Sequence, residues 1–180
     1  MRIKKESTIG LIIDFQERIV PAMCNREQLI ENTKKLISGL QILSVPLIAT
    51  QQYTRGLGET ISDISTLIND FGPIEKKTFS CYDEPLFLEA LERSEAKNVI
   101  ICGIESHVCV LQTAVDLKDA GYNPIIVLDC VSSRSIESVN IALDRFRFEG
   151  IMFTSFESVL FELTASAGAP EFKPISNLVK

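Results

Sequence analysis

The sequence has little that would build a metal centre, a nucleic-acid surface or a membrane anchor. His107 is its single histidine, so a histidine-rich metal site is excluded and a mixed cysteine–histidine site is not expected. The net charge of −6 and the absence of a basic stripe with interleaved aromatic residues argue against nucleic acid as a partner. No apolar stretch approaches membrane-spanning length. We therefore expect neither a nucleic-acid nor a membrane partner.

The chain also lacks the patterns of secretion, disulfide formation and nucleotide binding. Its first residues contain no apolar segment of the kind found in signal peptides. The five cysteines are odd in number, scattered, and form no Cys-x-x-Cys pair, which is typical of reduced thiols. No GxGxxG or Walker-type glycine loop is present. These features predict a cytoplasmic protein without a nucleotide cofactor.

With 180 residues, of which 46% are hydrophobic, the chain is expected to form one domain. Strand-like and helix-like segments alternate along it, which predicts an α/β fold with a mainly parallel sheet covered on both faces. We expect the packed core to span about residues 8–163, and a tail, 164–180, to be loose or used in assembly. The expected strands are 8–13, 46–50, 99–101, 124–128 and 151–153.

Polar residues follow the ends of several predicted strands. Asp14, Gln51, Cys109 and Asp129 each come after such an end. Because the carboxyl ends of parallel strands share one edge of a sheet, and open α/β sheets bind their ligands there, these side chains are expected to converge.

Cys109 is the candidate nucleophile. It lies in the first turn of a predicted helix that follows the strand 99–101 and Gly103. Unpaired N–H groups and the positive end of the helix dipole favour a thiolate at such a position. Gly103 also permits the unusual dihedrals that would direct backbone N–H groups at an oxyanion. The other four cysteines lack this setting.

Three further residues have alternative interpretations. Asp14 is either a catalytic base or a turn residue. Lys76 would stabilise a thiolate and orient the aspartate. The alternative is an ordinary solvated lysine, and the adjacent Lys77 leaves it ambiguous which of the two lysines has a role in the site. Because His107 precedes Cys109 by two residues, the two side chains point to different helix faces. We therefore favour a packing or capping role for His107 over a role as the base for Cys109.

Three motifs together resemble the isochorismatase-like cysteine hydrolase superfamily over about residues 9–163. They are Leu11-Ile-Ile-Asp-Phe-Gln16, Ile74-Glu-Lys-Lys-Thr-Phe-Ser80 and Gly103-Ile-Glu-Ser-His-Val-Cys-Val110. The resemblance implies a three-layer α/β/α sandwich, Rossmann-like in its arrangement, that assembles into dimers or larger rings. Within this superfamily, the sequence is similar in particular to the isochorismatase-domain hydrolases whose substrates are unsettled.

The resemblance also implies roles for individual residues. The family's catalytic Asp, Lys and Cys fall on Asp14, Lys76 and Cys109, and its cis peptide falls on Ile104–Glu105, where the N–H groups of Glu105 and Cys109 would form an oxyanion hole. No cofactor is implied. Further candidates for the substrate pocket are Phe15, Gln16, Gln51, Tyr53, Ser80 and His107.

At two places the sequence differs from characterised members of the superfamily, and each difference argues against one enzymatic activity. Nicotinamidases of this superfamily hold a metal with histidines after the second strand, where this chain has Gln51-Gln-Tyr-Thr-Arg-Gly-Leu-Gly58. Isochorismatase itself lacks the nucleophilic cysteine that Cys109 supplies here. The expected function is therefore hydrolysis of an amide-like C–N bond in a small molecule through a thioester. The alternatives are an oligomeric binding protein that retains the pocket without catalysis, and a redox-responsive thiol protein.

Overall fold

The computed structural model describes residues 2–180 and centres on a six-stranded sheet. All neighbouring strands pair in parallel, in the order β3-β2-β1-β4-β5-β6. The strands are β1 (Thr8–Ile13), β2 (Leu47–Gln52), β3 (Ile74–Lys76), β4 (Asn98–Ile104), β5 (Asn123–Ser132) and β6 (Met152–Thr154). The predicted parallel α/β architecture is confirmed.

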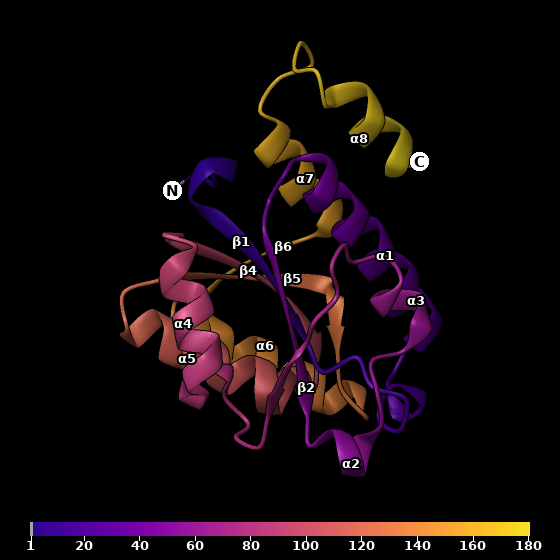
Figure 1. The fold of residues 1–180 in the computed structure, drawn as a ribbon, viewed down its shortest axis with the longest axis vertical. Coiled ribbons are helices and arrows are strands. Elements are labelled where there is room, and N and C mark those ends of the chain that lie inside the picture. Colours follow the sequence, from indigo (N-terminus) through magenta and orange to yellow (C-terminus); the bar gives the residue numbers. More distant parts are fainter. Residues whose placement is uncertain (1) are drawn as a thin grey trace.

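Helices connect the strands and lie on both sides of the sheet. They are α1 (Arg26–Ile42), α2 (Thr54–Leu57), α3 (Ser62–Ser65), α4 (Pro85–Arg93), α5 (Leu111–Asp119), α6 (Ile136–Phe148), α7 (Phe156–Thr164) and α8 (Phe172–Leu178). Figure 1 shows that the two chain ends lie at the opposite end of the molecule from α2.

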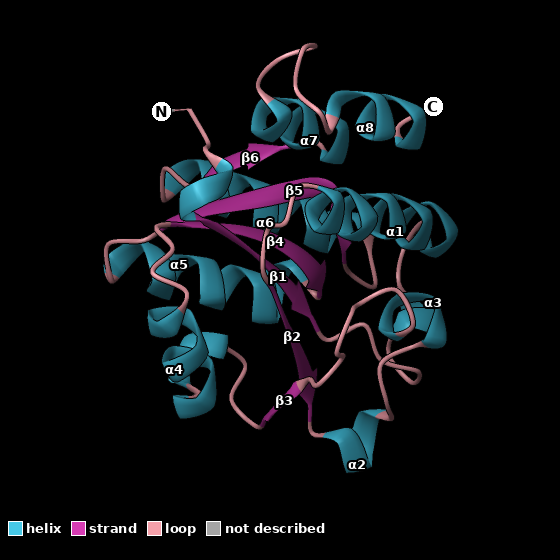
Figure 2. Cartoon of the chain, turned by 45° about the horizontal axis from the view of Figure 1, so that its top comes forward, coloured by secondary structure: helices cyan, strands magenta, loops and turns pink. Residues whose placement is uncertain are grey.

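The two faces of the sheet bury separate apolar cores, because successive side chains of a strand point to opposite faces. In β1, Ile12 packs in the core covered by α1, α7 and α8, whereas Leu11 and Ile13 pack in the core covered by α4, α5 and α6. Figure 2 shows these two groups of helices on either side of the sheet. The predicted three-layer arrangement is therefore present.

Strand β5 is longer than predicted, which changes the setting of Asp129. The strand continues to Ser132, so Asp129 lies within it rather than at the carboxyl edge of the sheet. Its carboxylate accepts a hydrogen bond of 2.9 Å from the backbone N–H of Phe156, just after β6. The expectation that Asp129 joins the strand-end cluster is wrong, and its side chain instead caps the start of α7.

The C-terminal segment is also better ordered than predicted. Helix α8 packs against α1 and α7, and Ile175 on it is fully buried in the core. An ion pair of 2.8 Å joins Lys5 to Glu171, and the rings of Phe161 and Phe172 lie 6.3 Å apart. Of the two alternatives, a loose tail is wrong, because this short segment carries an apolar residue that completes the core; a role of the tail in assembly stays a prediction.

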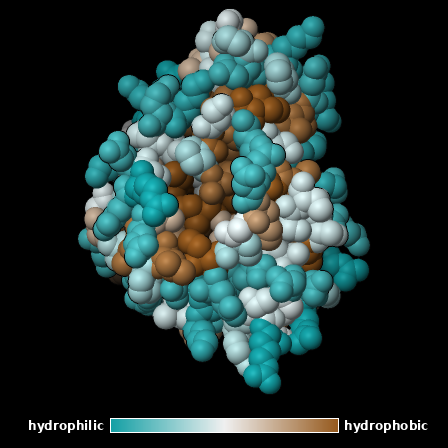
Figure 3. Space-filling view, viewed as in Figure 1, coloured by the Kyte–Doolittle hydropathy of each residue, from teal (hydrophilic) through white to brown (hydrophobic). Residues whose placement is uncertain are grey.

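The outer edge of β2 is only partly covered. Strand β3 pairs with Thr50 to Gln52 alone, so the outer edge of the first half of β2 lines two cavities of about 280 Å³ each. Figure 3 shows hydrophobic side chains gathered in a hollow on this side of the molecule. Within residues 2–180, the helices are too short or too polar to cross a membrane.

Candidate active site

Strand ends bring Asp14, Lys76 and Cys109 to one edge of the sheet. Asp14 directly follows β1, and Lys76 is the last residue of β3. Cys109 lies in a π-helical turn, Ser106–Val110, between β4 and α5. Since β3, β2, β1 and β4 are consecutive neighbours and all parallel, residues that are far apart in sequence meet at their carboxyl ends.

Asp14 and Lys76 form a buried ion pair. The distance from Lys76 Nζ to Asp14 Oδ2 is 2.7 Å, and the two side chains are 0% and 2% exposed. The other carboxylate oxygen, Oδ1, accepts a hydrogen bond of 2.8 Å from the hydroxyl of Thr50 on β2. Asp14 has a left-handed backbone with a φ of 56°. Both carboxylate oxygens are thus held in place at the turn after β1.

The remaining hydrogen bonds of the Lys76 ammonium go to oxygen atoms of neighbouring residues. Nζ donates to Gln52 Oε1 at 2.7 Å and to the carbonyls of Thr78 and Phe79 at 3.3 and 3.2 Å. Burial acts to lower the pKa of Lys76, but the Asp14 carboxylate and two nearby thiols raise it, and the pKa ends above its usual 10.5. Lys76 is therefore charged at neutral pH.

Cys109 lies beside this pair as a buried thiol. It is 6% exposed. Burial raises its pKa to about 12, the Asp14 carboxylate adds to this effect, and Lys76 opposes it. The expected effect of the helix start, which favours a thiolate, is outweighed by desolvation and a neighbouring negative charge. The site instead places a neutral thiol next to a carboxylate.

The turn that carries Cys109 is set by the close approach of β4 to β1. Gly103 has a φ of 144°, and a β-carbon there would overlap the backbone of Ile13, so only glycine fits. The Ile104–Glu105 peptide bond that follows is cis, at the position to which the resemblance assigns it. Backbone N–H groups of Val108 and Val110 both donate to the Glu105 carbonyl, at 3.1 and 3.2 Å.

Glu105 joins this turn to the loop after β5. Its carboxylate accepts hydrogen bonds from Arg134, at 3.2 Å from the backbone N–H and 3.0 Å from Nε. Among residues 2–180, the backbone N–H of Glu105 finds no acceptor, and the buried hydroxyl of Ser106 has no hydrogen-bond partner. Two polar groups of the turn that carries Cys109 are therefore without a partner in the described part of the chain.

His107 points away from the other candidate residues. Its Nδ1 lies 2.9 Å from the hydroxyl of Ser133, and the residue borders a cavity of about 530 Å³ together with Asp83 and Leu111. The packing or capping role favoured for His107 stays a prediction, as does its place in the substrate pocket.

Several predicted pocket residues are occupied by structural contacts. Phe15 is fully buried in the core under α1. Gln51 bonds with Thr54, Glu59 and Thr60 in the loop after β2.

Gln16 is fully buried and binds backbone groups of Gln52 and Gly58. Ser80 is 1% exposed, and its hydroxyl accepts a hydrogen bond from the Tyr82 N–H. Tyr53 differs from these residues, because its side chain is 47% exposed next to the strand that ends at Lys76.

Sequence reasoning missed Thr50, Gln52, Cys81 and Arg134. The two residues on β2 contact Asp14 and Lys76 directly. Cys81 is fully buried near the same charges, and burial raises its pKa to about 11. The end of a predicted strand was a usable signal for Gln52, whereas nothing in the local sequence marked Arg134.

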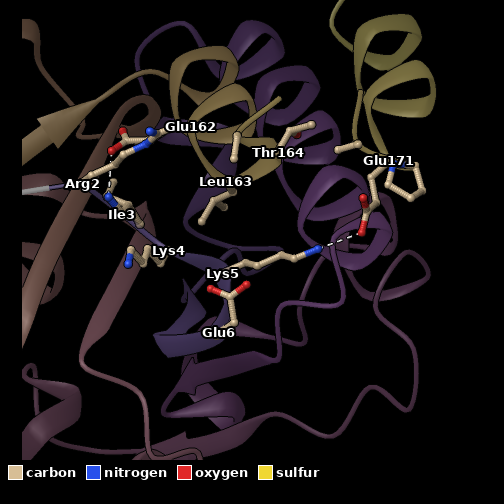
Figure 4. A pocket seen from close by; sticks show the side chains of 12 residues that line it. Arg2, Ile3, Lys4, Lys5, Glu6, Glu162, Leu163, Thr164 and Glu171 are labelled. Carbon is tan, nitrogen blue, oxygen red and sulfur yellow. Dashed lines mark hydrogen bonds and ion pairs between the residues drawn. The ribbon is translucent and has the colours of Figure 1, made fainter. Parts of the chain in front are cut away.

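A separate cavity lies away from these residues. It measures about 620 Å³ and is bordered by residues 2–6 and by parts of 162–171, at the end of the sheet where β1 begins. Figure 4 shows Lys5 reaching toward Glu171 across this cavity. Within residues 2–180, Asp14, Lys76 and Cys109 do not border this cavity. In the same range, His, Cys, Asp and Glu side chains form no group of three or more that could hold a metal.

Comparison with known proteins defines the family. The isochorismatase domain model matches residues 8–158. The secreted isochorismatase effector Isc1 of Phytophthora sojae is 37% identical over 99% of this chain and 87% of its own length. A solved structure titled MAR1 ribonuclease, from Caenorhabditis elegans, has a TM-score of 0.93 at 33% identity and covers 99% of this chain and 92% of its own.

A more distant neighbour agrees in fold. The YcaC gene product of Escherichia coli, titled an octameric hydrolase of unknown specificity, has a TM-score of 0.90 at 19% identity, over 99% of this chain and 95% of its own. The chain belongs to the isochorismatase-like hydrolase family.

Proposed function

We propose that this chain is a hydrolase that cleaves an amide-like C–N bond of a small molecule with Cys109 as its nucleophile. The observation that carries the proposal is the buried Asp14–Lys76 pair beside a buried thiol. A carboxylate that is fixed by two neighbours and faces a neutral thiol is suited to general-base catalysis. The Lys76 charge would stabilise the negative charge that forms as the proton leaves.

The reaction has two steps. Asp14 takes the Cys109 proton while Sγ attacks the carbonyl carbon. The C–N bond then breaks, and the proton passes to the leaving ammonia or amine, so that a thioester remains on Cys109. In the second step Asp14 takes a proton from water, the water oxygen attacks the thioester, and the thiol is regenerated with release of the acid. These steps need only water as a co-reactant.

Backbone N–H groups would stabilise the oxyanion of both steps. The Glu105 N–H has no acceptor within residues 2–180, which supports its assignment to an oxyanion hole together with the Cys109 N–H. Each such donor contributes about 3 kcal/mol to the transition state in comparable sites. The Ser106 hydroxyl is a further group that a substrate could pair with.

The test is ammonia release from a panel of small primary amides, with hydroxylamine added to trap the thioester as a hydroxamate. Wild-type protein should yield both products, and Cys109→Ala should yield neither while it retains the circular-dichroism spectrum of the fold. Ammonia release by Cys109→Ala would refute the mechanism. Cleavage of a structured RNA is assayed in parallel, because one solved relative carries the name ribonuclease; the net charge of −6 does not favour that substrate.

A second candidate is a non-catalytic binding protein. One observation favours it: Asp14, Lys76 and Cys109 are only 1%, 1% and 6% exposed, which limits the access of a substrate to them. Amides that bind without turnover, and a Cys109 that resists every electrophile, would support this candidate.

Assembly and location complete the proposal. We propose that copies of this chain assemble into a homo-oligomer, in keeping with the octameric YcaC. All five cysteines are free thiols, which suits a reducing compartment such as the cytoplasm.

A further inference from the structure

The Lys76 ammonium has no donor left for Cys109. A lysine ammonium carries three N–H groups. One donates to Asp14, one to Gln52, and the third is directed at the adjacent carbonyls of Thr78 and Phe79. Lys76 therefore acts on the thiol only through its charge. A residue that keeps the Lys76 ammonium charged and in place therefore controls its effect on the Cys109 thiol.

Gln52 is held in a fixed position by its own contacts. Its side-chain Nε2 donates to the Lys77 carbonyl at 2.9 Å, which turns Oε1 toward Lys76. Its backbone N–H donates to Gln16 Oε1 at 2.7 Å, and its carbonyl accepts from Gln16 Nε2 at 3.0 Å. Gln16 is fully buried and also donates to the Gly58 carbonyl at 2.7 Å. Two glutamines thus hold the end of β2 against the lysine.

We propose that Gln52 is a positioning residue that keeps Lys76 protonated and directed at Asp14. The inference rests on the proposed function, in which the Lys76 charge assists the Cys109 thiol. A buried ammonium that loses an acceptor pays the desolvation cost of an unpaired donor. Without Gln52 Oε1, the neutral amine of Lys76 therefore becomes more favourable.

The test measures the charge of Lys76 directly. The ¹³Cε signal of Lys76, assigned by its loss in Lys76→Met, is titrated from pH 7 to 11 in the wild type and in Gln52→Met, which keeps the length of the side chain but removes the acceptor. We expect the pKa of Lys76 to fall by about one unit or more in Gln52→Met. Gln52→Glu keeps an acceptor oxygen and should show no such fall.

Gln41→Met is the matched control. Gln41 on α1 is a half-buried glutamine that likewise binds backbone groups, accepting from the Asn69 N–H and donating to the Leu67 carbonyl. Its loss removes comparable hydrogen bonds far from Lys76. The pKa of Lys76 should stay at the wild-type value in this variant, even where stability falls.

Alkylation of Cys109 by iodoacetamide gives the functional readout. At pH 7, where Lys76 is charged in every variant, the rate constant of Gln52→Met should remain within about twofold of the wild type. At pH 10 it should be lower by about two- to threefold, since a one-unit fall in the pKa of Lys76 reduces its protonated fraction at that pH by about this factor.

The possible results distinguish a failure of the role of Gln52 from a failure of the proposed function. An unchanged Lys76 titration in Gln52→Met, with normal reactivity of wild-type Cys109, refutes the role of Gln52 and leaves the proposed function intact. A wild-type Cys109 that does not react at all refutes the proposed function itself. An equal loss of rate at pH 7 and pH 10 would assign Gln52 to packing alone and would also overturn the inference.

Discussion

Lys76 Nζ and Asp14 Oδ2 lie 2.7 Å apart with both side chains almost completely removed from solvent. The two residues are 62 positions apart in the sequence and meet because β3 and β1 flank β2 in one parallel sheet. The pair supplies a fixed base and a fixed positive charge beside Cys109. Its burial makes the site sensitive to the removal of either partner.

Replacement of Lys76 by methionine should destabilise the fold strongly. It leaves the Asp14 carboxylate buried without its counter-charge, which costs about 3–5 kcal/mol in comparable cases. The exposed neighbour Lys77 provides the control, and Lys77→Met should change stability by less than about 0.5 kcal/mol. Urea unfolding measures both. The double variant Asp14→Asn/Lys76→Met should recover much of the loss, and equal effects of the two lysine variants would argue against a buried pair.

Stability should fall as the pH rises above 9. Burial raises the pKa of Cys81 to about 11 and the pKa values of Cys102 and Cys109 to about 12, from an ordinary value of 9.0. A raised pKa in the folded state contributes stability that is complete below pH 9 and is lost as the pH rises toward the folded-state values. Each thiol adds a slope of up to about 1.4 kcal/mol per pH unit.

Urea midpoints between pH 8 and 11 measure this loss. Cys102→Ala removes one of the titrating thiols, so its stability should decline less steeply over the same interval. A flat or rising stability above pH 9 would contradict the burial of these thiols.

Substitution of Gly103 by alanine should be among the most damaging changes in the chain. The new methyl group would overlap the backbone of Ile13, and the φ of 144° disfavours any side chain. We expect a loss of roughly 3–5 kcal/mol, from backbone strain and overpacking together. Gly121 also has a positive φ, 87°, but nothing lies within 4 Å of an added β-carbon. Thermal unfolding of Gly121→Ala should therefore show a smaller loss, of about 1–2 kcal/mol.

The sequence predicts the arrangement of the site better than its chemistry. Alternating strands and helices were sufficient to expect a parallel sheet, and hence to expect Asp14 and Cys109 at one edge. The pKa of Cys109 could not be predicted from the helix turn alone, because it depends on burial and on a carboxylate 95 positions earlier in the sequence. The contacts of Thr50 with Asp14 and of Gln52 with Lys76 depend on strand register, which the sequence pattern does not determine.

Chain ends and strand lengths were the least predictable features of the fold. The segment after residue 164 has the composition of a loop, yet one buried side chain, Ile175, docks it on α1 and α7. Asp129 resembles a residue at a strand end, but β5 continues past it to Ser132. In both cases tertiary packing overrides the local pattern.

The pH dependence of Cys109 alkylation tests the central claim most directly. A thiol beside a carboxylate and a thiolate beside a carboxylic acid contain the same number of protons, so the reactive form has a population that does not change with pH. Limiting iodoacetamide is applied between pH 6 and 8, and the modified cysteine is identified by mass spectrometry, with a cysteine-containing peptide as the reference. We expect a nearly constant rate for Cys109 and its loss in Asp14→Asn, while the reference rate rises about tenfold per pH unit. A Cys109 rate that follows the reference peptide, or that is unchanged in Asp14→Asn, would contradict the account.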